Sequence, residues 1–367
     1  MAEQKQFSFG VTTLMGARFG VLRFLIKKYG YDKKYRKKVF YTHLISLVVT
    51  GLGYFDRLVF ALKKKPTKLK DPIFVLGHWR SGTTHLHNLV CLDEETAYTT
   101  TYQTVFPNNL FSFQWLFKGL MRIAMPSHRP VDNVKLDPNY PQEEEFALNN
   151  EIPFSFYNWW YFPKSTRAIA DEYLLDKTAS EKAKKEWAEN FKRFVTRCIL
   201  NTKGVRFVSK NPPHTARIPE LLKLYPNAKF VFIHRNPYEV VRSTNAFYKS
   251  ILEGIKIQDI SEEQLMEDIL YGYKELIAKY EIDKPVIPEG NLLEVTYSEL
   301  VEDSKLSIER IYSDLLKDDF SRIEKHLDGY LSKQSHVLKE YKYEPEFIAK
   351  VNAALGHILE SQGYQKL

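Results

Sequence analysis

Cysteine is scarce in this chain, because only Cys91 and Cys198 occur among its 367 residues. Both fall in apolar helical patterns, so we expect buried free thiols and no disulfide. No set of cysteines and histidines has the spacing of a zinc site, and the sequence therefore predicts no structural metal.

Long uninterrupted hydrophobic runs are also missing. The most apolar segment, 39–62, has an uncharged centre of about 12 residues, short of the roughly 20 that cross a bilayer. The N-terminus lacks the basic region and cleavage site of a signal peptide, so the expected location is the cytoplasm. We expect residues 10–62 to form two or three helices that pack on the rest of the chain. The alternative is that they also make a peripheral contact with a membrane.

Charge of one sign is in modest excess. The chain carries 53 Lys and Arg against 45 Asp and Glu, a formal net charge of +8. This excess favours a polyanionic small molecule or an anionic membrane surface, and it is too diffuse to indicate a nucleic-acid partner. Lysine runs at 27–28, 33–38 and 63–70 concentrate it near the N-terminus.

The pattern beyond residue 70 alternates strands with helices. Apolar, β-branched segments predict strands at 73–77, 205–209, 229–234 and 292–296, and helical patterns lie at 83–92, 178–201, 215–225 and 262–282. The segment 93–141 has no regular pattern, and a helix is expected from Pro141 to about Asn150. The prediction is an α/β, P-loop-like three-layer domain over 71–367, with a mainly parallel sheet flanked by helices and a basic helical extension over 1–70. Ligands are then expected beyond the carboxyl ends of the strands.

The loop after the first strand resembles a nucleotide-binding loop with one change. Gly77 and Gly82 have the Walker A spacing, but Thr83 stands where the lysine for ATP is expected. A kinase without that lysine and magnesium has little to neutralise a triphosphate. A sulfuryl group carries less negative charge than a phosphoryl group, and Arg80 within the loop is suited to stabilise its transfer without a metal.

A second phosphate-binding pattern follows the strand at 229–234. Asn236 can cap a helix that begins at 236 or 237, and Glu239 can complete a capping box. Ser243 then lies about 10 Å along the helix axis, within reach of a phosphate that the Arg235 guanidinium also contacts.

Together these motifs resemble the sulfotransferase superfamily, whose donor is 3′-phosphoadenosine 5′-phosphosulfate (PAPS) and whose product is PAP. Arg80 to Thr84 is similar to the family's 5′-phosphosulfate loop, and Arg235 with Ser243 matches its 3′-phosphate site in residue type and spacing. The likeness covers roughly residues 70–365 and is greatest to a bacterial-type branch. It implies transfer of a sulfuryl group to a hydroxyl, with no metal required. The donor-binding candidates are Arg80, Ser81, Gly82, Thr83, Thr84, His85, Arg235 and Ser243.

The catalytic base has several candidates. The cytosolic branch uses a histidine, but the aligned position here is Pro212, and His214 stands two residues on. Glu143 and Glu145 lie in a pattern similar to one in the bacterial branch, and we prefer these carboxylates to His214 as the base. Lys210, at a strand end, is a candidate contact for the sulfonate.

The acceptor is inferred from aromatic content. Residues 106–117 and 154–162 are rich in Phe, Trp and Tyr, which suits a pocket for a sterol or other lipid alcohol, a sugar-binding surface, or ordinary core. With the basic N-terminus, we expect a lipophilic small-molecule acceptor. Trp79 is expected either to stack on adenine or to pack under the loop, and 334–343 loosely resembles the family's closing segment over the nucleotide. A P-loop kinase-like enzyme and a non-catalytic nucleotide-binding protein are the other function classes.

Overall fold

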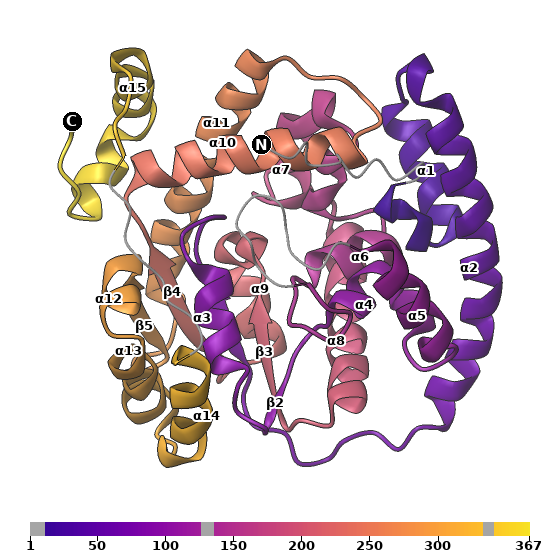
Figure 1. The fold of residues 1–367 in the computed structure, drawn as a ribbon, viewed down its shortest axis with the longest axis horizontal. Coiled ribbons are helices and arrows are strands. Elements are labelled where there is room, and N and C mark those ends of the chain that lie inside the picture. The colour runs from indigo at the N-terminus through magenta and orange to yellow at the C-terminus, as the bar shows by residue number, and fades with distance from the viewer. Residues whose placement is uncertain (1–11, 126–135, 333–340) are drawn as a thin grey trace. The chain divides into compact units, whose positions relative to one another are not determined.

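Five parallel strands form one sheet in the order β2-β3-β1-β4-β5 (Figure 1). Their bounds are β1 Ile73–Leu76, β2 Thr96–Ala97, β3 Arg206–Lys210, β4 Lys229–His234 and β5 Leu292–Thr296. Four of the five lie within a residue of the predicted strands, and β2 was not predicted. The structure is a computed structural model that describes residues 12–125, 136–332 and 341–367. It confirms the predicted parallel α/β architecture.

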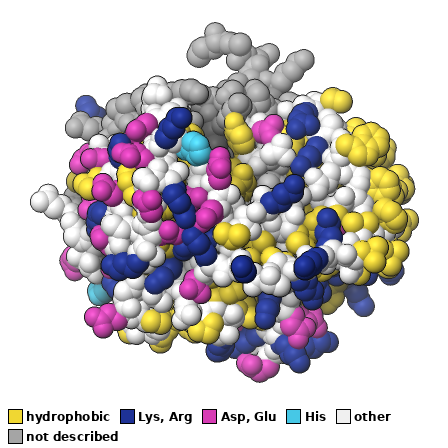
Figure 2. Space-filling view, turned by 90° about the horizontal axis from the view of Figure 1, so that it is seen from below, with side chains coloured by type: hydrophobic (Ala, Val, Ile, Leu, Met, Phe, Trp, Pro, Cys, Tyr) yellow, Lys and Arg dark blue, Asp and Glu magenta, His cyan; other side chains and the backbone are white. Residues whose placement is uncertain are grey.

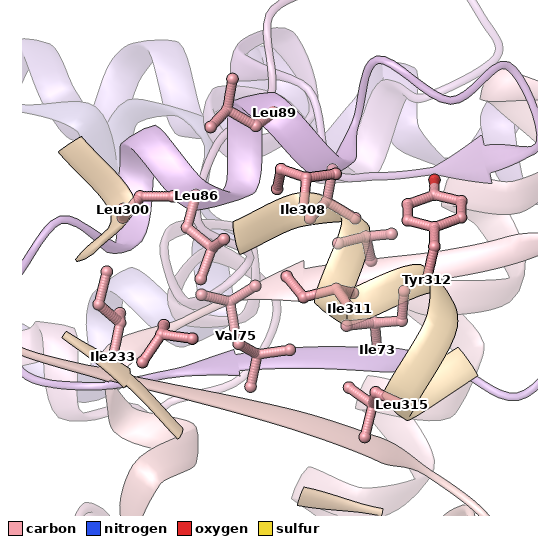
Figure 3. Close-up of a cluster of buried hydrophobic side chains, with 14 of the residues drawn as sticks. Ile73, Val75, Leu86, Leu89, Ile233, Leu300, Ile308, Ile311, Tyr312 and Leu315 are labelled. Carbon is pink, nitrogen blue, oxygen red and sulfur yellow. The ribbon is translucent and has the colours of Figure 1, made fainter. Parts of the chain in front are cut away.

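Helices cover both faces of this sheet. On one face, β1 and β4 side chains such as Val75 and Ile233 pack with Leu86 of α3 and Ile311 (Figure 3). On the other face, Phe74 stacks on Phe230 with ring centroids 5.6 Å apart. The sheet is therefore buried on both sides, which explains why its strands have continuous apolar sequences.

The chain divides into two units. The sheet unit comprises Pro66–Tyr98, Cys198–Thr244 and Ile269–Leu367, and the helical unit comprises Met1–Lys65, Thr99–Arg197 and Asn245–Asp268. The expected boundary at residue 70 stays a prediction. Cys91 and Cys198 are free thiols, as predicted, but only Cys198 is fully buried and Cys91 is half-buried.

The helices of the sheet unit are α3 Thr83–Val90, α9 Ile218–Leu224, α12 Tyr297–Glu302, α13 Ser304–Arg310, α14 Ser321–Leu331 and α15 Pro345–Ser361, with a π-helical turn at Ile311–Leu316. Those of the helical unit are α1 Phe19–Tyr29, α2 Arg36–Leu62, α4 Thr101–Val105, α5 Gln114–Ala124, α6 Glu145–Glu151 and α7 Thr166–Tyr173. Three more, α8 Glu181–Thr202, α10 Pro237–Ile255 and α11 Glu262–Asp283, contain residues of both units. The helices expected over residues 10–62 are thus present.

Some predicted helix boundaries are wrong because contacts with residues distant in the sequence determine the backbone conformation. Helix α6 begins at Glu145 and not at Pro141, because Pro141 bridges to Thr100 and the Gln142 amide donates to the Thr99 carbonyl. These contacts hold residues 141–142 in an extended conformation. The segment 93–141 also contains α4 and α5, and the capping box from Thr100 to Gln103 is the sequence signal for α4 that was missed.

The helix predicted at 215–225 is also wrong at its start. Residues Pro212–Ala216 form a 3₁₀ turn, and α9 begins only at Ile218. Pro219 has no N–H to donate and restricts the residue before it, so a helix restarts here instead of continuing.

Candidate functional site

The loop from β1 to α3 is a tight connection built on left-handed backbone. Gly82 caps α3 at φ 99° and Arg80 has φ 69°. The first intrahelical bond runs from the Leu86 amide to the Gly82 carbonyl, so the amides of residues 83–85 lie at the helix N-terminus, the end that attracts anions. The predicted loop residues Ser81, Thr83 and His85 are buried and Thr84 is half-buried.

Arg80 is directed toward the second motif. Its Nε donates to the Ser243 hydroxyl at 3.0 Å. These residues are 163 positions apart in the sequence, but β1 and β4 are adjacent strands, so the segments that follow them meet at the same edge of the sheet. The structure therefore brings the two predicted phosphate-binding motifs into direct contact.

Arg235 follows β4 and lies at the same edge. Its guanidinium lies 4.2 Å from the centroid of the Tyr297 ring and donates to the Glu239 carboxylate, through Nε at 2.9 Å. The predicted cap is confirmed, since the Tyr238 amide donates to Asn236. Glu239, expected to complete a capping box, accepts from Arg235, and the capping box itself stays a prediction.

Tyr297 is a residue that sequence reasoning missed. It follows β5, and a Cβ added at Gly82 would lie 2.4 Å from its ring. The Tyr297 ring therefore packs against both Gly82 of the loop and the Arg235 guanidinium. Its sequence signal was available, because it directly follows a predicted strand whose carboxyl end lies at this edge.

The histidines around the loop are mostly structural. His78 stacks on Tyr273 with centroids 4.2 Å apart, and burial lowers its pKa to about 4. His87 contacts the Val208 carbonyl, and burial, together with the Lys210 charge, lowers its pKa to about 3. Trp79 is buried edge-on against His78, which favours packing under the loop over stacking on adenine.

Lys210 and His214 occupy different environments. Lys210 ends β3 and pairs in register with Val75, two residues before Gly77, so it lies next to the phosphate loop. His214 is completely buried and packs edge-on against Phe74, in the middle of β1. This position is that of a core side chain.

The two acidic candidates lie in the helical unit and have different partners. Glu145 is fully buried, and its Oε1 accepts from the Ser155 hydroxyl at 2.9 Å and the Phe156 amide at 3.2 Å. Glu143 is only half-buried and accepts from the Tyr157 hydroxyl. Glu145 is thus held as a structural acceptor, whereas Glu143 keeps contact with solvent.

Both aromatic segments contribute to the core of the helical unit. Tyr157 and Trp160 are buried, and Trp159 packs on Tyr248 with centroids 4.6 Å apart. Phe106 and Phe117 stack at 4.6 Å between centroids. Of the segment compared with the family's closing element, residues 334–340 lie outside the described residues.

Comparisons with known proteins agree with these motifs. The sulfotransferase family model matches residues 72–316, more than half of the chain. The chain is 29% identical over 330 residues to the omega-hydroxy-beta-dihydromenaquinone-9 sulfotransferase Stf3 of Mycobacterium bovis, covering 89% of this chain and 84% of that protein.

Two solved structures share the fold. Sulfotransferase STF9 from Mycobacterium avium has a TM-score of 0.69 at 15% identity, covering 95% of this chain and 97% of that one. STF1 from Mycobacterium tuberculosis has a TM-score of 0.64 at 17% identity, covering 92% and 90%. Because the family model covers residues 72–316, the chain belongs to the sulfotransferase family and is a sulfotransferase.

Proposed function

We propose that the chain transfers a sulfuryl group from PAPS to the hydroxyl of a lipophilic alcohol. The observation that carries this proposal is the Arg80 to Ser243 hydrogen bond, which joins the phosphosulfate motif to the 3′-phosphate motif. Arg80, Lys210 and Arg235 supply three cations along one edge of the sheet, and the adjoining N-terminus of α3 favours an anion. These residues fit a nucleotide that carries two separate phosphate groups.

The chemistry follows from these charges. The acceptor oxygen forms a bond to sulfur while the bond from sulfur to the bridging oxygen of the 5′-phosphate breaks, so negative charge accumulates on the departing phosphate. In the proposed assignment, Arg80 and Lys210 stabilise this charge, and Arg235 with Ser243 binds the 3′-phosphate. This division of roles requires no metal.

Glu143 is the base that we propose for the acceptor proton. A general base must be reachable by the acceptor; Glu143 is half-buried, whereas Glu145 is fully buried with two hydrogen bonds to residues 155–156. His214 packs in the core against Phe74. Both remain alternatives to Glu143, and all three can be separated by mutation.

The proposed acceptor class rests on a relative. Stf3 is named for a hydroxylated menaquinone, which is a lipid alcohol, and a similar substrate suits this chain. A carbohydrate acceptor is the alternative.

Donor binding is tested by thermal shift with PAP and with ATP, each in the presence of EDTA. We expect PAP to stabilise the protein and ATP to do so less, because ATP lacks a 3′-phosphate. Arg235→Ala should weaken PAP binding by about 10- to 100-fold, as expected for a lost charge-assisted hydrogen bond. A protein that binds ATP with magnesium and ignores PAP would contradict the proposal.

Transfer is tested with PAPS labelled in the sulfuryl group, against a hydroxylated isoprenoid quinone, a sterol and a sugar. Glu143→Gln should lower kcat by about 10²- to 10⁴-fold and remove the acidic limb of the pH profile, with PAP affinity unchanged. Glu145→Gln and His214→Gln are the matched variants. If either of them alone produced this kinetic signature, the base would be reassigned to that residue.

A further inference from the structure

Helix α2 buries several polar residues and exposes most of its large apolar ones. The residues buried in the helical unit are Val39, Thr42, Ser46, Val49, Gly53 and Asp56. Ser46 donates to the Ala17 carbonyl at 2.7 Å, and one Asp56 oxygen accepts from the amides of Phe111 and Ser112, both at 2.7 Å. A surface helix of a water-soluble domain normally has the reverse arrangement.

The exposed side of α2 is a stripe of large apolar side chains. Phe40, Leu44, Leu47, Phe55, Leu58 and Leu62 are all exposed, and the last is 88% exposed. Successive members are three, four or eight residues apart, which places them on one side of the helix. From residue 40 to residue 62 the stripe extends about 33 Å at 1.5 Å per residue.

Helix α5 adds to this surface. Its inner side chains Phe117 and Met121 share a core with Val49 of α2, so the two helices pack together. Its outer side chains Trp115, Leu120 and Ile123 are exposed, Ile123 by 85%. We call these three residues and the α2 stripe the apolar surface. Figure 2 shows hydrophobic side chains gathered at the right of the view, the side on which Figure 1 draws α2.

Cations flank the α2 stripe, and the single acid in the sequence of α2 is buried. Between residues 33 and 65 the sequence has one acid, Asp56, which is buried. At the start of α2, Arg36 and Lys37 are exposed, while Lys34 is paired with Asp259 at 2.6 Å. Beyond its end, residues Lys63, Lys64 and Lys65 are exposed. An apolar strip with cations at both ends is complementary to an anionic bilayer surface.

The geometry distinguishes lying on a membrane from crossing one. Residues 33–62 form a helical stretch that is long and apolar enough, by length and composition, to span a bilayer. However, one side of α2 is bonded to its own unit along the helix, through Thr42, Ser46 and Asp56. A helix covered on that side cannot be surrounded by lipid.

We propose that the apolar surface inserts into the interface of an anionic membrane and holds the enzyme there as a monotopic protein. This inference rests on the proposed function, because a water-insoluble alcohol acceptor would be found in a membrane and the enzyme would have to reach it there. Membrane binding itself is measured without any acceptor.

The test is co-sedimentation with vesicles of equal parts phosphatidylcholine and phosphatidylglycerol. The wild-type chain should bind, and the double variant L47E/L58E should bind at least about tenfold more weakly, because two exposed leucines that would enter the lipid become charged. The control I282E/V286E makes the same kind of change at exposed positions of α11 and the turn after it. It should bind like the wild type.

The basic residues provide a second, independent variant. K63Q/K64Q/K65Q should weaken binding to the anionic vesicles by up to about 100-fold and leave the weaker binding to pure phosphatidylcholine unchanged. It also carries the test if L47E/L58E proves unfolded by circular dichroism. No binding by the wild type, or equal binding by every variant, would overturn the proposal.

Two further outcomes distinguish membrane binding from dimerisation and from the proposed enzymatic function. If the wild type dimerises in solution, L47E/L58E abolishes the dimer and no variant binds vesicles, the surface is an interface between copies and the membrane proposal fails. PAP binding measured on the same samples reports the proposed function separately, so a chain that binds PAP but no vesicles refutes the membrane proposal alone.

Discussion

Helices α3 and α2 use their apolar side chains in opposite ways. In α3, Leu86, Leu89 and Val90 are buried against the sheet, and the helix N-terminus carries the phosphate loop. In α2, Leu44, Leu58 and Leu62 are exposed, and Ser46 and Asp56 are buried. The difference indicates two uses of hydrophobicity: one anchors the helix that follows the proposed nucleotide-binding loop, and the other forms the surface that we propose to contact a membrane.

The largest effect that would test this contrast is the loss of turnover on substitution of Arg80, in the loop before α3. Arg80→Ala should lower kcat by about a thousandfold, because a preorganised charge on the transferring group is lost. PAP affinity should fall much less, and vesicle binding should not change. Arg80→Lys, which keeps the charge, is the control. If PAP affinity fell more than turnover did, the roles assigned to Arg80 and Arg235 would be exchanged.

The next largest effect is on stability. Leu86→Ala should reduce the free energy of unfolding by about 3 kcal/mol, from lost burial and the cavity left under α3. Urea denaturation measures this directly. A loss below about 1 kcal/mol would mean that the core beneath the phosphate loop relaxes around the cavity, and the contrast with α2 would be weakened.

Acid should weaken the region around α3. His78 and His87 have pKa values lowered to about 4 and about 3, chiefly by burial. The unfolded chain, with histidine near pKa 6.5, binds more protons than the folded one below that pH. The two histidines therefore leave the free energy of unfolding unchanged above about pH 6.5. Below that pH they lower it, by about 2 kcal/mol per pH unit near pH 5. Thermal unfolding from pH 7 to 5 tests this, and His78→Phe, which keeps the ring stacked on Tyr273, should reduce the slope.

The smallest effect is expected on α2. Leu58 is 64% exposed, so Leu58→Ala should change the free energy of unfolding by less than about 0.5 kcal/mol. Urea denaturation beside Leu86→Ala makes the comparison quantitative. A cost as large as that of Leu86→Ala would show that the side chain is covered in solution, as it would be in a dimer.

The sequence predicted the parts of the fold whose signals are local. The strands β1, β3, β4 and β5 have continuous apolar runs, and Pro237 marks the start of α10. The placement of both motifs at one sheet edge followed from a general property of parallel sheets, whose carboxyl ends share that edge. The hydrogen bond between Arg80 and Ser243 was not predicted. These features depend on neighbours along the chain or on a rule of topology.

The parts that could not be predicted depend on distant partners. Helix α6 starts late because Thr99 and Thr100 hold Pro141 and Gln142, and His214 is in the core because Phe74 lies beside it. Periodicity identified α2 as a helix but could not say which side it buries, since Asp56 and Ser46 find hydrogen-bond partners that are remote in sequence.

The contact between Arg80 and Ser243 has a thermodynamic consequence. An arginine side chain has many rotamers, and restricting them costs about 2 kcal/mol. Because Ser243 already holds the guanidinium, much of that restriction accompanies folding and does not have to accompany ligand capture. Calorimetry of Ser243→Ala should therefore show a more unfavourable entropy of PAP association than the wild type, in addition to the enthalpy lost with the hydroxyl.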